Sequence, residues 1–398
     1  MVALSLMKAI RCREVVGSFV ARLVLTDVSH GVREPTGPRS SFGVGEHTKK
    51  DRPLMSIKFN RSNLALAFAG STIVSAASGA VSAAPAASGT DTVSVSAGQT
   101  SSPAQLVDAL HSAFGKHPAR AVHAKGVILE GDFTPNAHAA ALTTAAHLQK
   151  THSAITVRFS DFTGIPDIAD NIGLANPRGF AIKFRLPDGS TTDIVGHSFN
   201  GFPTPTSDQF RELLLAIAAS GPDAAKPTAL DKFLGSHPIA KTFLTTQKTP
   251  ASFGTITYFG VNAFELTNQA GVRHYVRYQF VPTAGEHLST ADQLAKAGPN
   301  YLMDEIRSRV AKGPIKYQMY AQLAEPGDVI TDPSVAWPDG RKKVLLGTVE
   351  IKRLASNTPE QDKALAFSPN NLPDGIKTAD PMLEFRSKAY PISVKERQ

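Results

Sequence analysis

Segments rich in β-branched and aromatic residues follow one another through the middle of the chain, with turn residues between them. Residues 155–162 (ITVRFSDF) and 178–186 (RGFAIKFRL) are two such segments, and the turn sequence PDGS follows the second. Residues 192–199 (TDIVGHSF) then fit the returning strand. Successive hairpins of this kind favour an antiparallel sheet, because short turns can join only antiparallel neighbours.

Further segments extend the same pattern. A second hairpin is predicted over 262–281 across the turn sequence NQAG, and another strand over 342–354. In 315–323 (IKYQMYAQL) apolar residues alternate with polar ones, which predicts a strand with one buried face. Helical patterns occupy 207–219 and 289–311. We therefore predict an α+β fold, with an antiparallel sheet that is open or closed as a β-barrel and helices added to it.

The globular part of the chain begins near residue 103, where Leu106, Leu110 and Phe114 recur at helical spacing. No internal repeat and no later linker divides the sequence that follows. Residues 103–398 are therefore predicted to form one domain. Residues 84–102 consist mainly of Ala, Ser, Thr, Gly and Pro, which predicts a flexible lead-in.

Residues 55–83 show the three parts of a secretory signal peptide. Lys58 and Arg61 precede an apolar run at 64–74, and small residues follow at the spacing that a signal peptidase accepts. The run is too short and too broken by Gly and Ser for a good membrane span, so no stable membrane insertion is expected after cleavage. The prediction is a periplasmic or secreted protein; the alternative is an Ala-rich disordered linker.

The basic character of the sequence belongs mostly to its N-terminal part. The net charge of +8 by itself would suggest an anionic partner. Residues 1–83, however, carry 11 of the 42 Lys and Arg and 5 of the 34 Asp and Glu, so the rest has 31 basic and 29 acidic residues. Nucleic-acid binding is therefore not expected. Residues 1–54 fit neither a signal nor a core, and we predict a non-physiological upstream extension or a disordered one.

Cysteine chemistry is excluded from the predicted domain. The single cysteine, Cys12, lies in the N-terminal extension. The remaining chain has neither a thiol nor a disulfide, so thiol catalysis and cysteine-based zinc sites drop out.

Two segments of the predicted domain carry residues suited to chemistry. His123 lies in an apparent strand, RAVHAKG, with Arg120 three residues before it. A lone histidine in such surroundings is more often a satisfied core residue than a catalytic group. Arg158 and Ser160 flank Phe159 in a predicted strand and so point to one face. An inward arginine needs an anion or a carboxylate; the alternative is a polar stripe that faces solvent.

The sequence ends on FRSKAYPISVKERQ, in which Arg386 and Tyr390 are four residues apart. On a helix these two side chains would be neighbours. A cation held close lowers the pKa of a tyrosine hydroxyl from its usual value near ~10. Arg386 could thus hold Tyr390 as a phenolate, and tyrosinate is one of the axial ligands of haem iron. The alternative is an ordinary helical tyrosine beside a surface arginine.

The chain resembles the haem catalase family in a series of motifs that keep the family's order from residue 120 to residue 391. These are RAVHAKG, VRFS, NPRGFAIKF, TDIVGH, VAWP, FSPNNLPDGI and R-x-x-x-Y-P. In particular, the chain is similar to the short catalase-related peroxidases of bacteria, which are often exported. The resemblance implies a catalase-like antiparallel β-barrel with surrounding helices that lacks the C-terminal helical region of full catalases.

The resemblance also implies roles for individual residues. His123 matches the distal catalytic histidine, and Ser160 matches the serine that orients it. Tyr390 matches the ligand of the iron, and Arg386 its charge partner. The other implied cofactor contacts are Val122 beside the distal histidine, Phe210 on the distal side, and Arg120, Arg158 and Arg397 at the haem propionates.

Three positions depart from the family pattern. His197 stands where catalases have an asparagine that hydrogen-bonds peroxide, so it joins the candidate catalytic residues. An imidazole is larger than an amide and titrates near ~6.5 when unperturbed, so we expect it to crowd the pocket or change its role with pH. Asn176 replaces an aspartate of the access channel, and Asn262 replaces a histidine on the proximal side. Efficient catalase turnover is therefore not expected.

The implied function is that of a haem b peroxidase that reduces hydrogen peroxide with a small organic electron donor, with weak catalase activity at most. Two alternatives stay open at this point. One is a haem enzyme that acts on organic or fatty-acid hydroperoxides. The other is an exported haem-binding protein without turnover. Assembly as a homo-oligomer is also left open.

Overall fold

The computed structural model describes residues 100–356 and 359–398. The predicted extension at 1–54, the predicted signal peptide at 55–83 and all but the last residues of the lead-in at 84–102 lie outside the described residues. Within the described ranges, no helix is both long enough and apolar enough to cross a membrane.

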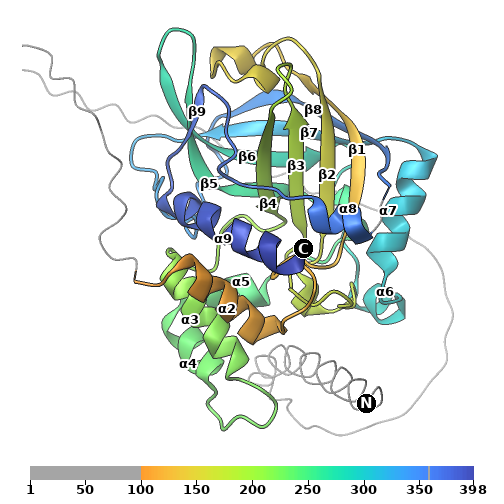
Figure 1. Ribbon diagram of the computed structural model, residues 1–398, viewed down its shortest axis with the longest axis vertical. Helices are drawn as coiled ribbons and strands as arrows, with labels where there is room; N and C mark the ends of the chain where they lie inside the picture. Colours follow the sequence, from red (N-terminus) through yellow and green to blue (C-terminus); the bar gives the residue numbers. More distant parts are fainter. Residues whose placement is uncertain (1–99, 357–358) are drawn as a thin grey trace, which may run out of the picture. The chain divides into compact units, whose positions relative to one another are not determined.

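The strands form one antiparallel sheet that closes into an eight-stranded barrel (Figure 1). Its order is β4-β3-β2-β1-β8-β7-β6-β5, and the ring closes where His197 of β4 pairs with Phe259 of β5. The short strand β9 pairs with residues 264–266 of β5, on the edge of β5 that does not face β6. The strands are β1 (Gly126–Pro135), β2 (Ser153–Ser160), β3 (Gly179–Arg185), β4 (Thr191–His197), β5 (Tyr258–Thr267), β6 (Arg273–Pro282), β7 (Ile315–Leu323), β8 (Lys343–Leu354) and β9 (Ile376–Thr378).

The predicted antiparallel sheet and its hairpins are confirmed, but one expected strand is wrong. The segment around His123 was expected to be a strand, yet β1 begins only at Gly126. Residue 123 has a φ of 58°, in the left-handed region that a strand cannot accommodate. The backbone amides of His123 and Ala124 instead bond to the carbonyls of Phe162 and Thr163 in the loop after β2. The histidine is thereby presented from an irregular segment at the end of the barrel.

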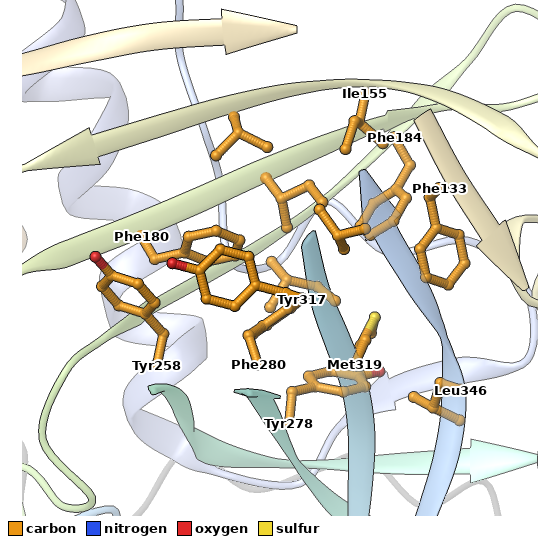
Figure 2. Packing of buried hydrophobic residues seen from close by; sticks show 14 of the residues in the cluster. Phe133, Ile155, Phe180, Phe184, Tyr258, Tyr278, Phe280, Tyr317, Met319 and Leu346 are labelled. Atoms are coloured by element: carbon orange, nitrogen blue, oxygen red, sulfur yellow. The ribbon is translucent and has the colours of Figure 1, made fainter. Parts of the chain in front are cut away.

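Alternation along the strands fills the barrel with aromatic and aliphatic side chains. Figure 2 shows the cluster of rings at its centre, which includes Phe180, Tyr258, Phe280 and Tyr317. Tyr258 and Tyr317 are fully buried, and both hydroxyls donate to the carbonyl of Phe253, at 2.9 and 2.6 Å. Buried phenols of this kind cost little because their polar ends are paired. The packed core therefore holds the ends of the strands in place, so that side chains at one end of the barrel can form a site of fixed geometry.

The helices lie outside the barrel, and one predicted helix is interrupted. The helix expected over 289–311 is split into α6 and α7 around Gly298 and Pro299, since proline has no amide to donate and restricts the residue before it. The helix expected over 207–219 is confirmed as α3. The helices are α2 (Pro103–Phe114), α3 (Ser207–Ala218), α4 (Ala229–Ser236), α5 (Pro238–Thr245), α6 (Ala291–Lys296), α7 (Tyr301–Lys312), α8 (Pro359–Ala364) and α9 (Pro381–Arg397).

Helix α9 lies across one end of the barrel, with α2 to α5 on its other side (Figure 1). Its Ala389 is buried with Leu106 and Leu110 of α2 and Leu214 of α3 in a second hydrophobic cluster. The side chain of Asp380 caps the helix by accepting a hydrogen bond from the amide of Met382 at 2.9 Å. The C-terminal helix is therefore packed against the end of the barrel, and this packing places Arg386 and Tyr390 in the wall of the cavity described below.

His147 lies in the barrel core without a hydrogen-bond partner. The residue is 1% exposed, and neither ring nitrogen is paired within the described part of the chain. Its ring packs on Phe184 at 4.7 Å and on Phe133 at 6.5 Å, measured between centroids. Burial lowers the pKa of His147 to about 3. The imidazole is therefore neutral at ordinary pH, and its unpaired polar atoms cost stability.

We expect His147→Leu to stabilise the protein by about 1–3 kcal/mol at neutral pH, because an unsatisfied buried group is removed. The histidine pKa is near ~6.5 in the unfolded chain and about 3 in the folded protein, so between these pH values the unfolded chain binds more protons. The free energy of unfolding of the wild type therefore falls as the pH drops through this window, and that of the variant should fall less. Urea unfolding at pH 7 and pH 5 measures both effects. His147→Gln keeps a polar side chain in place, and equal gains from both substitutions would contradict the explanation.

Candidate functional site

A cavity opens between the end of the barrel and the helices α2, α3 and α9. About 1390 Å³ of space free of protein atoms lies in this region, open solvent at its mouth included. Every residue that the sequence singled out for the site lines it: Arg120, Val122, His123, Arg158, Ser160, His197, Phe210, Arg386, Tyr390 and Arg397.

His123 is held so that one ring nitrogen is fixed and the other is available. Its Nδ1 lies 2.9 Å from the carbonyl oxygen of Asp161 and 3.1 Å from Ser160 Oγ. A carbonyl can only accept, so Nδ1 carries the proton and Nε2 is left with its lone pair. Burial, and then the charge of Arg158, lower the pKa of His123 to about 4. The residue is thus a neutral acceptor on the cavity wall at ordinary pH.

Gly179 and Phe162 complete the surroundings of His123, and sequence reasoning had assigned them no role. A Cβ at Gly179 would collide with both Ser160 Oγ and His123 Nδ1, so glycine is needed for these two groups to meet. The ring of Phe162 stands edge-on to the imidazole, with centroids 5.6 Å apart. Gly179 belongs to the motif NPRGFAIKF, so the sequence did contain a feature that could have drawn attention to it. No motif pointed to Phe162.

Buried ion pairs fix the loops that present His123. Arg178 and Asp161, both without exposed surface, form a salt bridge directly behind the carbonyl that holds the imidazole. Lys125 Nζ binds Asp170 Oδ1 at 2.5 Å and the carbonyl of Ile168 at 2.7 Å. Breaking a buried pair leaves an uncompensated charge, so these contacts tie the segment firmly to the barrel.

A chain of side-chain contacts leads to Tyr390. Arg386 donates from Nη2 to the Tyr390 oxygen at 2.6 Å and from Nη1 to Asn262 Oδ1 at 2.8 Å. Asn262 in turn donates to Asp380 Oδ2 at 2.7 Å. The i, i+4 neighbourhood of Arg386 and Tyr390 is thus confirmed, and Asn262 holds the guanidinium in place. The positive charge lies where it can balance a negative charge on the tyrosine oxygen.

Three arginines from distant parts of the chain meet at another edge of the cavity, next to α8. Arg120 and Arg158 bind the two carboxylate oxygens of Asp362, at 2.7 and 3.0 Å. Arg397 donates to the carbonyls of Lys363 and Leu365, at 2.9 and 3.0 Å. Among the side chains that the structure describes, Asp362 is the one carboxylate in ion-pair contact with this cluster. No sequence pattern had pointed to it.

The arginine cluster keeps an excess of positive charge. Burial, and then the charge of Arg158, lower the pKa of Arg120 to about 9, which still leaves it cationic near neutrality. Burial alone would raise the pKa of Asp362, but the charges of Arg158 and Arg120 outweigh it and the pKa is lowered. Three cations beside one anion leave two charges to be balanced. This arrangement suits a ligand with two carboxylates, because unpaired buried charge is costly.

The remaining wall is apolar. Val122 and Phe210 are partly buried, and the Phe210 ring packs on Phe202 with centroids 4.9 Å apart. His197 lies at the end of β4 with 9% of its surface exposed, and its ring lies edge-on to Phe243 at 5.9 Å. Such a lining favours a large apolar ring system over a purely polar ligand.

At two of the positions that depart from the family pattern, His197 and Asn176, the structure differs from what the sequence led us to expect. Burial, and then the charges at His123 and Arg386, lower the pKa of His197 to about 3. The expectation that this imidazole changes its role with ordinary pH is therefore wrong. Asn176 does not line the cavity; it donates from Nδ2 to Thr249 Oγ1 at 2.8 Å.

These features fit a haem. The parts of the chain that the structure describes contain no cluster of three or more His, Cys, Asp and Glu able to hold a metal ion by itself. A single tyrosine oxygen balanced by an arginine suits an iron whose other ligands come from a porphyrin. The apolar walls accommodate the ring, and the two uncompensated arginine charges match its two propionates. Tyr390, Arg120, Arg158 and Arg397 are the residues that would hold the group.

Comparison with known proteins places the chain in a family. The sequence model of the family described as Catalase matches residues 90–398. A catalase-related peroxidase of Mycolicibacterium paratuberculosis is 35% identical over 74% of this chain and 94% of its own length. A catalase-related peroxidase of Synechococcus elongatus is 30% identical over 74% of this chain and 88% of its own length. Catalase-2 of Bacillus subtilis is 27% identical, and only 43% of its length is covered.

Solved structures show the same fold. The crystal structure of a fungal catalase matches with a TM-score of 0.64 and 21% identity, over 71% of this chain and 59% of the other. Catalase A from Saccharomyces cerevisiae gives a TM-score of 0.63 at 20% identity, over 71% and 62%. The chain thus spans about three fifths of the length of these catalases. With the family match over residues 90–398, the chain belongs to the catalase family.

Proposed function

We propose that this protein is a haem b peroxidase that reduces hydrogen peroxide with a small organic electron donor and has only weak catalase activity. Membership in the catalase family makes the chain an oxidoreductase that acts on peroxide. The observation that carries the finer proposal is the anchored His123, whose Nε2 is left as an acceptor in the cavity that also holds Tyr390. A protein that merely stores haem has no need of a positioned base.

The chain's own residues would bind the cofactor and move one proton. A bound haem supplies the electron-transfer chemistry, with Tyr390 as the protein ligand of its iron. His123 Nε2 accepts the proton from one oxygen of hydrogen peroxide and returns it to the other oxygen, which leaves as water. Ser160 and the Asp161 carbonyl keep the ring in the required tautomer. The donor supplies the two electrons, and two protons complete the balance to two waters.

Two observations favour peroxidase over catalase activity. The relatives that this chain covers almost from end to end are named catalase-related peroxidases, whereas 43% of Catalase-2 from Bacillus subtilis is covered. In addition, an imidazole at position 197 restricts the space for a second peroxide more than an amide would. An organic donor needs only to approach the edge of the bound group.

Haem titration and peroxide assays on the full chain test the proposal. We expect one haem to bind per chain, and peroxide consumption to rise strongly when a reducing dye is added, with little oxygen released. Haem binding without turnover of peroxide would support a storage protein instead. Faster turnover of cumene hydroperoxide than of hydrogen peroxide would favour an organic hydroperoxide as substrate. Oxygen release that exceeds dye oxidation would reject the peroxidase assignment.

We also propose that the protein is exported to the periplasm or beyond. The support is the order of charge, apolar run and small residues over 55–83. Translation would start functionally at Met55, and the mature chain would begin near Ala84. Mass spectrometry of the periplasmic fraction gives the mature N-terminus. A cytoplasmic chain that begins at Met1 would reject the proposal.

A further inference from the structure

One short segment of the chain, residues 362–365 at the end of α8, holds the arginine cluster at the edge of the cavity. Arg120 donates from Nη1 to the Asp362 carboxylate at 2.7 Å, and from Nη2 to the carbonyls of Asp362 and Leu365 at 2.8 and 2.7 Å. Arg158 donates from Nε to the other carboxylate oxygen of Asp362 at 3.0 Å. This carboxylate therefore bridges two arginines that come from different parts of the sequence.

These contacts leave Arg120 no pair of adjacent N–H groups for a second carboxylate. A guanidinium binds a carboxylate in bidentate fashion through two parallel N–H groups, and each of its two such pairs includes a hydrogen of Nη2. Both hydrogens of Nη2 are engaged, one by the carbonyl of Asp362 and one by that of Leu365. A bidentate contact between Arg120 and a haem propionate therefore requires that a contact with residues 362–365 is given up.

Asp362 is the partner that can leave at the lowest cost. Its side chain is 33% exposed, whereas the side chains of Arg120 and Arg158 are 12% and 4% exposed. Both arginines line the cavity and Asp362 does not, so its carboxylate lies on the outer side of the cluster, where it can turn into water. The arginines cannot do the same, and a buried cation needs an anion. A propionate ends in the same chemical group as the aspartate and can replace it.

We propose that Asp362 competes with a haem propionate for Arg120 and Arg158: it pairs with these arginines in the haem-free chain and turns outward when a propionate takes its place. The proposal rests on the proposed function, because it requires that the cavity binds haem. Arg397 still holds the carbonyls of Lys363 and Leu365, so α8 stays attached and the displaced carboxylate remains near the cluster. The contact lowers haem affinity and relieves the repulsion among three buried cations.

The test substitutes Asp362→Asn, which nearly keeps the size of the side chain and removes its charge. A contact that exists only without haem weakens haem binding by the same factor by which it stabilises the haem-free chain. We therefore expect haem affinity, measured by titration of the full chain, to rise about 10-fold, an effect between those of exposed and buried ion pairs. The folding equilibrium constant of the haem-free chain, measured by urea unfolding, should fall by the same factor.

Two controls isolate the competition. Asp132 on β1 pairs with Lys352 at 2.8 Å and is 35% exposed, but it does not line the cavity, so Asp132→Asn should leave haem affinity unchanged. The dimethyl ester of haem has no charged propionate and cannot compete for the arginines. Its affinity should therefore be nearly equal in wild type and Asp362→Asn.

The outcomes separate this proposal from the proposed function. A lower haem affinity in Asp362→Asn would overturn the competition, because Asp362 would then support the bound propionates. An unchanged affinity, or an equal gain with the dimethyl ester, would overturn it too. In all these cases the proposed function stands, provided that the wild type binds haem and consumes peroxide; it fails if the wild type does not.

A second measurement decides if the haem-free Asp362→Asn chain does not fold. The haem-loaded variant and wild type are each mixed with excess apomyoglobin, which takes up released haem. Without an internal carboxylate that competes for the arginines, the variant should release haem more slowly than the wild type. Equal or faster release from the variant would contradict the proposal.

Discussion

Replacing Tyr390 by phenylalanine is expected to abolish stable haem binding, or to leave a haem with a changed spin state. The substitution removes the one oxygen of the cavity wall that Arg386 holds at 2.6 Å, and phenylalanine offers no ligand in its place. Losing a residue that only supports a ligand typically costs about 10–100-fold in metal affinity, so losing the ligand should cost at least this much. Haem titration and the absorption spectrum of the ferric protein measure the effect.

A matched substitution separates this effect from a general loss of a hydroxyl. Tyr320 lies on β7 and donates to Gln318 at 2.6 Å, away from the cavity lining, so Tyr320→Phe should bind haem normally. Arg386→Ala should weaken binding in the same direction as Tyr390→Phe but less, by about 10–100-fold, since the cation is lost and the ligand stays. An unchanged spectrum and affinity in Tyr390→Phe would overturn the assignment of the iron ligand.

His123→Ala is expected to retain haem and to lose peroxide turnover by about 10²–10⁴-fold, the usual contribution of a well-placed acid–base group. Haem should stay because the residues that would hold it, Tyr390 and the arginine cluster, are untouched. The measurement is the initial rate of peroxide consumption with a reducing dye. His138→Ala removes an exposed histidine from a turn and should leave the rate unchanged. A rate in His123→Ala close to that of wild type would exclude His123 as the proton acceptor.

The pH dependence of the wild type offers an independent check on His123. The base must be unprotonated to act, and its pKa is lowered to about 4. Activity that depends on this group should therefore be flat at neutral pH and fall as the pH drops through about 4. Since the rest of the protein also loses stability in acid, the profile should be taken within the range in which the haem spectrum stays constant. A fall centred near pH 6.5 would indicate a solvated, unperturbed imidazole.

Local patterns along the chain were sufficient for most of the strands and for the contact between Arg386 and Tyr390, whereas the resemblance to catalases supplied most of the candidate site residues. Alternation predicted β7, and β-rich segments joined by turns predicted the two hairpins, because pleating and tight turns act over a few residues. The spacing of Arg386 and Tyr390 predicted their contact for the same reason, since a helix brings residues four apart together. The segment of His123 was mistaken for a strand because its apolar neighbours look like one.

What the sequence determined by itself was the antiparallel class and the helical C-terminal segment, both read from short-range periodicity, together with the candidate site residues that its resemblance to the catalase family implies. Only the tertiary structure brought Asp362 against Arg120 and Arg158, more than two hundred residues away, and left His147 unpaired in the core. The tautomer of His123 also depends on a carbonyl group that loop geometry places beside its ring. Barrel closure and the docking of α9 decide these contacts, and no local pattern encodes which distant groups meet.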